Sequence, residues 1–216
     1  MVTGVSESEM KEAAQGTVQD GNLVYELEGK VYQISIKTIR GDYRTEQKET
    51  KNQLRQWEIH DFKPRPEDIF QERLYCIQWI TQETLKKSRQ ETYFASVTAA
   101  DLERERQVEQ IVQENLAIWQ EKGLVPDMAI EPGSKTDEPI RTRGWRYWHQ
   151  LFNARQTHYL SILKNRLAGD PYLRIADCKI LDKAAKLCRL RTRSKTDNRD
   201  IKIEAVFYNQ ALNTFF

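Results

Sequence analysis

Aromatic and cationic side chains are concentrated between Arg141 and Gln156, where the sequence reads RTRGWRYWHQLFNARQ. These sixteen residues include two Trp, one Tyr, one His and four Arg. Aromatic rings can stack on bases, and guanidinium groups between them can hold phosphates. The segment therefore contains candidate nucleic-acid-binding residues. A structural role is the alternative, and the composition favours it, because Trp145, Trp148 and Phe152 recur at helical spacing.

Positive charge extends from this segment toward the C-terminus. Residues 139–216 contain 16 Lys and Arg against 6 Asp and Glu, whereas the whole chain has a net charge of only +2. Such an imbalance indicates either an anionic partner or two halves of the chain that face each other. Residues 189–199 (RLRTRSKTDNR) are a predicted basic loop, which either contacts phosphates or is simply solvated.

Arg155 and Gln156 could reach a base edge or a phosphate, or they could bond carbonyl groups of the preceding loop, which we favour. Together with the basic loop, the segment supplies the predicted DNA-binding residues: Arg141, Arg143, Trp145, Arg146, Arg155, Gln156, Arg189, Arg191, Arg193 and Lys195.

The pattern WxxLFxxRQ, followed by an apolar helix, resembles an element of known enzymes. It is similar to the W-x-D-L-F-(N/T)-P-R-Q element of bacterial adenine-specific DNA methylases of the zinc-ribbon type, which occur in phage-defence gene clusters. The matching residues are Trp148, Leu151, Phe152, Arg155 and Gln156, with Ala154 where the family usually has Pro. Further similar stretches are Leu54–Trp57, Asp61–Phe62, Pro64–Pro66, Phe70–Tyr75 and Val206–Leu212.

The motifs that such a methylase needs for catalysis are absent from this sequence. The family binds S-adenosylmethionine at a Gly-rich turn and holds a flipped adenine at a D/N/S-P-P-aromatic loop. Asp170-Pro171-Tyr172 lacks the second Pro and is better explained as an N-cap followed by the first helical residue. The resemblance therefore implies a non-catalytic piece of a larger enzyme, with the cofactor bound outside this chain.

Metal binding is not expected. The cysteines Cys76, Cys178 and Cys188 form no CxxC pair, and the three histidines are scattered. No apolar run is long enough to cross a bilayer, and the first residues, MVTGVSESEMKEA, lack the features of a signal peptide. The expected compartment is the cytoplasm, without a membrane partner.

Apolar periodicity and capping residues predict a mostly helical α+β fold with an N-terminal β-hairpin and long irregular connections. The strands are expected at 23–28 and 31–37, and irregular segments at 40–53 and 124–143. The expected helices are 6–15, 67–82, 99–122, 154–168 and 171–190.

We predict one domain over residues 1–216, in which 1–45 form a helix-plus-hairpin appendage and 46–216 a helical part. The expected function is that of a non-catalytic segment of an adenine-specific DNA methyltransferase that contacts DNA or braces the catalytic fold. Its partners would be DNA and the remainder of the enzyme or a catalytic subunit. The alternative is a stand-alone nucleic-acid-binding or subunit-interaction module.

Overall fold

A computed structural model describes residues 17–134, 136–167, 184–186, 188–191 and 202–204. The expected helix at 6–15 and most of that at 171–190 lie outside these residues. Helices and small antiparallel sheets both occur, so the fold class is α+β with an N-terminal hairpin, as predicted.

The chain divides into two compact units, each assembled from separate stretches of sequence. The first comprises Met1–Arg55, Pro64–Leu102 and Arg141–Gly144. The second comprises Gln56–Lys63, Glu103–Ile140 and Trp145–Phe216.

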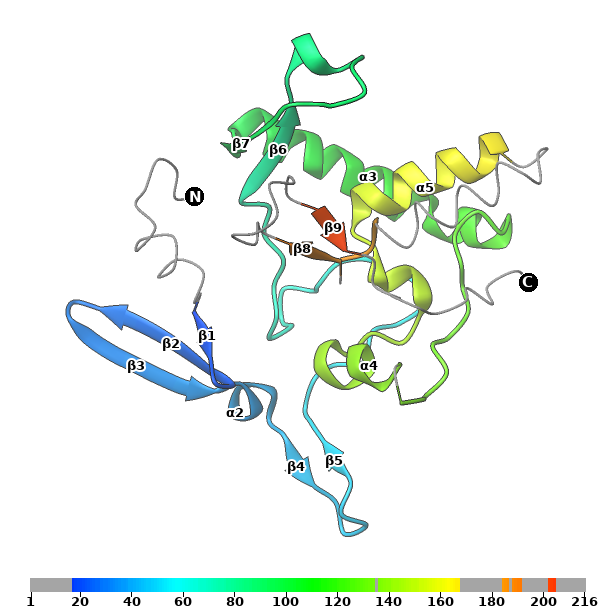
Figure 1. Ribbon diagram of the computed structural model, residues 1–216. Helices are drawn as coiled ribbons and strands as arrows, with labels where there is room; N and C mark the ends of the chain where they lie inside the picture. The colour runs from blue at the N-terminus through cyan, green and yellow to red at the C-terminus, as the bar shows by residue number, and fades with distance from the viewer. Residues whose placement is uncertain (1–16, 135, 168–183, 187, 192–201, 205–216) are drawn as a thin grey trace. The chain divides into compact units, whose positions relative to one another are not determined.

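The first unit begins with a three-stranded antiparallel sheet in the order β1-β2-β3 (Figure 1). Its strands are β1 (Val18–Gln19), β2 (Asn22–Leu27) and β3 (Lys30–Ser35), which confirm the predicted hairpin. The hairpin turn places Glu28 and Gly29 at positive φ, +52° and +74°. Two central residues at positive φ match the right-handed twist of the strands, and glycine adopts this conformation without steric cost.

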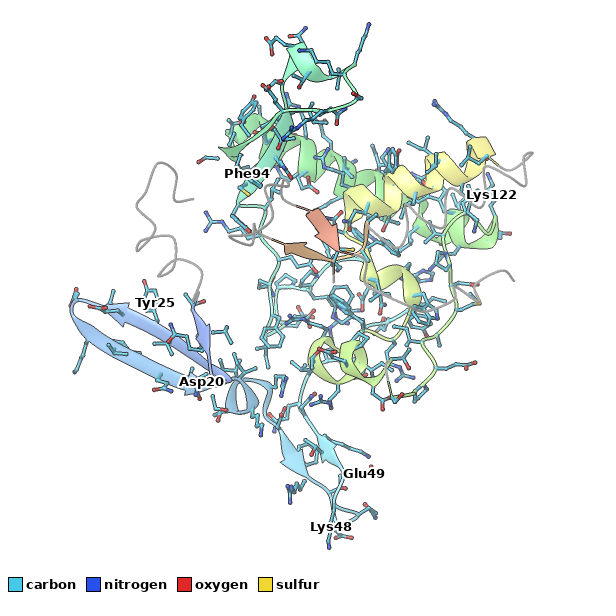
Figure 2. All side chains as sticks on the ribbon, in the orientation of Figure 1. Asp20, Tyr25, Lys48, Glu49, Phe94 and Lys122 are labelled. Carbon is cyan, nitrogen blue, oxygen red and sulfur yellow. The ribbon has the colours of Figure 1, made fainter. Side chains whose placement is uncertain are left out.

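The region expected to be a solvated loop, 40–53, contains regular structure. Helix α2 (Ile36–Arg40) precedes a short ladder between β4 (Tyr43–Arg44) and β5 (Thr50–Lys51). Figure 2 shows Lys48 and Glu49 at the tip of this ladder. The Arg40 guanidinium donates two hydrogen bonds to the Asp42 carboxylate, at 3.0 and 2.7 Å. Polar contacts thus order a segment that has no apolar alternation, which corrects the prediction.

The helix predicted at 67–82 is wrong. Instead, β6 (Cys76–Ile80) pairs with β7 (Thr92–Ser96), and a 3-10 turn, η1 (Gln82–Thr84), follows β6. Aromatic and β-branched residues dominate both strands, and such residues pack well on a pleated sheet. The strand that pairs with β6 begins sixteen residues after the start of β6. Helical periodicity within a short stretch of sequence cannot reveal such a partner.

Helix α3 (Ala99–Glu121), which belongs to the second unit from Glu103 onward, confirms the longest predicted helix. Its N-terminus is capped reciprocally: the Thr98 hydroxyl accepts from the Asp101 N–H, and the Asp101 carboxylate accepts from the Thr98 N–H and hydroxyl. Gly123, at φ +65°, follows the helix. Glycine suits this position because it tolerates the left-handed conformation that ends many helices.

Helix α5 (Ala154–Leu167) lies alongside α3 (Figure 1). Asn153 and Gln156 exchange hydrogen bonds of 2.9 Å between side chain and backbone, which caps the N-terminus of the helix. The Trp119 ring on α3 stacks on the His158 ring on α5, with centroids 5.6 Å apart. The apolar cluster between the helices comprises Phe62, Val112, Leu116, Val125 and Ala154, with Val108 and Trp119 packed against it.

The expected irregular segment 124–143 ends in a short helix, α4 (Asp137–Arg143). The Asp137 carboxylate accepts from the Gly133 N–H at 3.0 Å and so closes the turn before the helix. Farther along lie η2 (Trp148–Leu151), β8 (Arg189–Arg191) and β9 (Lys202–Glu204). Because β8 pairs with β9, residues 189–191 are neither the end of a helix nor part of a loop, which corrects both expectations.

Residues 56–63 are irregular, yet Trp57 and Phe62 within them are 5% and 2% exposed. Three buried side chains donate to carbonyl groups of this segment: Gln150 to Glu58, Gln120 to Ile59 and His149 to Asp61. Gln150 also accepts from the N–H groups of Arg146 and Tyr147, at 2.7 and 3.0 Å. One side chain therefore satisfies three backbone groups in two segments that are far apart in sequence.

Replacing Gln150 with Leu should lower the free energy of unfolding by about 2–4 kcal/mol, because three backbone groups lose their partner in a buried place. Urea denaturation followed by tryptophan fluorescence measures the change. The matched control is Gln107→Leu on the exposed face of α3, where a change below about 0.5 kcal/mol is expected. Equal stability of the Gln150 variant and the unmodified protein would contradict this role.

Candidate nucleic-acid interface

The segment Arg141–Gln156 runs from the end of α4 to the start of α5, and its aromatic residues point inward. Trp145 is only 5% exposed and meets Trp57 edge-on, with ring centroids 6.1 Å apart. The surrounding apolar cluster comprises Trp57, Trp145, Leu151 and Ala185, with Trp148, Phe152 and Cys188 packed against it. The stacking role expected for Trp145 does not fit this burial, since almost none of the residue is accessible to a base.

A cation already covers both tryptophans of this cluster. The Lys186 Nζ lies 4.4 Å from the Trp145 ring centroid and 5.3 Å from that of Trp57. The backbone N–H of Lys186 donates to the Leu151 carbonyl at 2.7 Å, which fixes the lysine beside the rings. Contacts of this kind are attractive because the ring face is negative. Sequence reasoning missed Lys186, because nothing local marks it as a neighbour of Trp145.

Arg155 and Gln156 have structural partners. The Arg155 guanidinium donates two hydrogen bonds to one oxygen of the Glu105 carboxylate, at 3.0 and 2.7 Å. The Gln156 side chain accepts from the Asn153 N–H as part of the α5 cap. Both residues therefore hold the start of α5 in place, but these contacts are a carboxylate on α3 and a backbone N–H, not the loop carbonyl groups that we expected from the sequence.

Arg141, Arg143 and Arg146 are exposed. The Arg143 guanidinium lies over the Phe70 ring, 5.4 Å from its centroid, so the ring orients the side chain and leaves its charge in place. Within the described part of the chain, the guanidinium groups of Arg141 and Arg146 make no hydrogen bond or ion pair. They are therefore available to an anion.

Backbone contacts hold two of these exposed arginines, Arg141 and Arg146. Asn52 donates its side-chain amide to the Arg141 carbonyl. The Arg146 N–H donates to the buried Gln150 side chain, and its carbonyl accepts from the Ile130 N–H at 2.7 Å. An arginine on a fixed backbone loses less conformational freedom when it binds, which favours phosphate contact.

The remaining predicted residues are only partly placed by the structure. Arg189 and Arg191 lie in β8, where the backbone alone is described. Arg193 and Lys195 lie outside the described residues. Whether these four side chains gather with Arg141 or Arg146 stays a prediction.

Neither a cofactor site nor a metal site is apparent in the described residues. The glycines at positive φ follow helices or lie in tight turns, such as Gly29 between β2 and β3 and Gly41 after α2, and none forms a Gly-rich turn between a strand and a helix. No three His, Cys, Asp or Glu side chains gather there in a way that could hold a metal ion. The described part of the chain therefore does not fit the S-adenosylmethionine site that the family resemblance implies.

No model of a known protein family, no curated protein and no solved structure matches the chain. Among the helices of the described ranges, none is long and apolar enough to cross a bilayer. Membership of the adenine methylase family therefore stays a proposal that rests on the sequence motifs.

His149 stabilises this region only in its neutral form. Its side chain is 1% exposed, and its Nε2 lies 3.2 Å from the Asp61 carbonyl oxygen, so Nε2 is the donor. Burial, which disfavours the charged imidazolium, lowers the pKa of His149 from 6.5 to about 4. In the unfolded chain the same group is protonated below its ordinary pKa of about 6.5.

As the pH drops from about 6.5 to 4, His149 becomes protonated in the unfolded state but stays neutral in the folded state. The free energy of unfolding should therefore decrease over this range. Between about pH 7 and pH 4.5 the free energy of unfolding should decrease by roughly 2–3 kcal/mol through this residue. The variant His149→Asn keeps a donor for the Asp61 carbonyl and removes the titrating group. Urea denaturation at both pH values should show a smaller decrease for this variant.

Titration of the carboxylates Asp42 and Asp68 does not obscure this effect of His149. Hydrogen bonds from Arg40 and Arg55 hold their pKa values below the usual 3.8, so their contributions are lost only at still lower pH. An identical pH dependence in the His149→Asn variant and the unmodified protein would show that another group causes the loss.

Proposed function

We propose that this chain is a non-catalytic, DNA-contacting part of an adenine-specific DNA methyltransferase. The observation that carries the proposal is the exposure of Arg141, Arg143 and Arg146, each with its backbone or side chain held by a specific contact. Exposed guanidinium groups on a backbone that is held in place suit phosphate oxygens, which they can bind with paired hydrogen bonds.

The charge of the neighbouring sequence supports phosphate contact rather than base reading. No acidic residue occurs between Pro139 and Gly169, so nothing in that stretch competes for an incoming phosphate. The aromatic residues that could have read bases, above all Trp145, belong to the core. Contacts to phosphate position a protein on DNA without specifying sequence. We therefore propose that this region holds DNA without strong sequence preference.

The family resemblance supplies the enzymatic context of the proposal. In such an enzyme, S-adenosylmethionine provides the methyl group for the adenine amino group when it is bound. Because the sequence lacks the Gly-rich turn and the P-P-aromatic loop of that family, the rest of the enzyme or a separate subunit would bind the cofactor. This chain would contribute by positioning the duplex.

The variant with Arg141, Arg143 and Arg146 replaced by Ala should bind duplex DNA more weakly than the unmodified protein. The slope of log affinity against log salt should become less steep by about 0.9 for each lost phosphate contact. Fluorescence anisotropy with a labelled duplex at several salt concentrations measures both quantities. Thermal unfolding should be nearly unchanged, because exposed side chains contribute little to stability.

A second triple variant controls for the loss of total charge. Lys30, Arg44 and Lys122 are also exposed cations, in other parts of the chain, and replacing them with Ala removes the same charge. We expect this control to retain most of the salt dependence. Equal losses in the two variants would mean that binding depends on net charge alone, and unchanged binding in the arginine variant would remove the basis of the proposal.

One observation favours the alternative, a subunit-interaction module. Pairing of β1, β2 and β3 places most of their apolar side chains on one face of the sheet, and all but one of those on this face are 44–57% exposed. Figure 2 shows one of them, Tyr25, on β2. The face consists of Val18, Leu23, Tyr25, Leu27, Tyr32 and Ile34. Contiguous apolar patches of a few hundred Å² commonly mark interaction sites.

The occupant that we propose for this face is a second copy of the chain. Two such faces packed together would bury on the order of 800–1,000 Å², which is typical of weak association. Sedimentation equilibrium should therefore show a dimer that dissociates on dilution. Tyr32→Lys should abolish it, whereas Gln33→Lys on the opposite face should not. A strictly monomeric protein at all concentrations would exclude this candidate.

A further inference from the structure

The hairpin of β6 and β7 has two chemically different faces, which follow from its register. Trp79 pairs with Tyr93 and Ile77 with Ala95, so these four side chains share one face. Gln78 pairs with Phe94 and Ile80 with Thr92 on the other face. Figure 2 labels Phe94 on β7. The first face carries a cross-strand pair of aromatic rings.

These rings are open to solvent to an unusual degree for their type. Trp79 is 41% exposed and Tyr93 is 53% exposed. Tyr75, which directly precedes β6, is 73% exposed. Isolated exposed aromatic residues are common, but three on one short hairpin form an apolar surface that tends to find a partner.

The tip of the same hairpin is ordered and carries cations. Thr84 is 3% exposed, and its hydroxyl lies 2.6 Å from the Thr81 hydroxyl and accepts from the Glu91 N–H at 2.9 Å. The Thr84 carbonyl also accepts from the Lys87 N–H at 2.9 Å. These bonds hold the backbone that carries the exposed residues Lys86 and Lys87.

We propose that the β6–β7 hairpin binds single-stranded nucleic acid, with unpaired bases stacked on Trp79 and Tyr93 and the sugar–phosphate chain at Lys86 and Lys87. Aromatic platforms beside positive charge are the means by which proteins bind single strands without sequence preference. In a duplex the base faces are already stacked on each other and cannot reach such rings. The chemistry therefore selects an unpaired strand.

The face of the β6–β7 hairpin that carries Trp79 and Tyr93 differs in chemistry from the apolar face of β1, β2 and β3. The latter face also carries a cross-strand aromatic pair, Tyr25 and Tyr32, but the exposed aliphatic side chains of Val18, Leu27 and Ile34 share the face with it, which suits a second protein surface. On the β6–β7 hairpin the exposed rings are aromatic and the adjoining tip carries two lysines, which suits an anion with planar groups. The proposal uses none of the arginines of the proposed function and stands independently of it.

Trp79 also supplies a direct signal of binding. It is the most exposed of the five tryptophans, because Trp57 and Trp145 are 5% exposed and the other two are intermediate. Stacking of a base on its ring should quench its fluorescence. Titration with short oligothymidylate and oligouridylate should therefore quench the protein, and the quenching should disappear in a Trp79→Thr variant.

Affinity for the two homopolymers and for a duplex of the same length is measured by anisotropy. Trp79→Thr keeps a residue with strand preference and removes the ring. Affinity for the single strands should fall about 5- to 100-fold, as expected for one lost stacked base, and duplex affinity should stay within about twofold. The matched control, Gln78→Thr on the opposite face, should bind as the unmodified protein does.

The salt dependence tests the lysines separately. Replacing Lys86 and Lys87 with Ala should make the slope for single strands less steep by up to about 1.4, at 0.7 for each phosphate. The homopolymer that the protein binds more tightly, DNA or RNA, identifies the natural source of the strand. The fall in affinity caused by Trp79→Thr is expected for that homopolymer.

The outcomes separate this proposal from the proposed function. Weaker duplex binding in the arginine variant, with no effect of Trp79→Thr on single strands, would overturn the hairpin site alone. Loss of single-strand binding in Trp79→Thr, with duplex binding unaffected by the arginine substitutions, would support the hairpin site and overturn the proposed function alone. Unmodified protein that binds single strands no better than duplex would also overturn the hairpin site.

Discussion

The second unit depends on one requirement: the carbonyl groups of the irregular segment 56–63, whose Trp57 and Phe62 side chains are buried, need donors. A strand or helix would satisfy them within regular structure, and here no such element is present. Gln150, Gln120 and His149 donate to three of these carbonyls instead. Because an unpaired buried carbonyl costs about 1–3 kcal/mol, the three donors decide whether the segment can enter the core at all.

Satisfying these carbonyls also determines where the functional candidates lie. The Gln150 side chain binds the N–H groups of Arg146 and Tyr147 as well as the Glu58 carbonyl. It therefore holds the stretch in which Trp145 packs against Trp57 while Arg146 stays exposed. The aromatic and cationic residues of one sequence motif thus differ in position: the Trp145 ring is part of the core, and the Arg146 side chain is exposed.

Features that depend on neighbouring residues could be predicted from the sequence. Helix α3 follows from its apolar spacing and its Thr98–Asp101 cap, the start of α5 from Asn153 and Gln156, and the β2–β3 hairpin from alternation around a glycine turn. The β6–β7 hairpin could not, because its apolar spacing also fits a helix and its partner strand lies further along the chain. The place of Lys186 over two tryptophans depends on tertiary packing that no local pattern encodes.

Hydrogen exchange of the unmodified protein, with and without duplex DNA, tests the account of DNA contact most directly. Amide groups around Arg141, Arg143 and Arg146 should exchange more slowly in the presence of DNA, because bound phosphates restrict the opening of this backbone. Amides of β2 and β3, whose apolar face we assign to protein association, should be unaffected. Slower exchange confined to β2 and β3, or no change anywhere, would contradict the account.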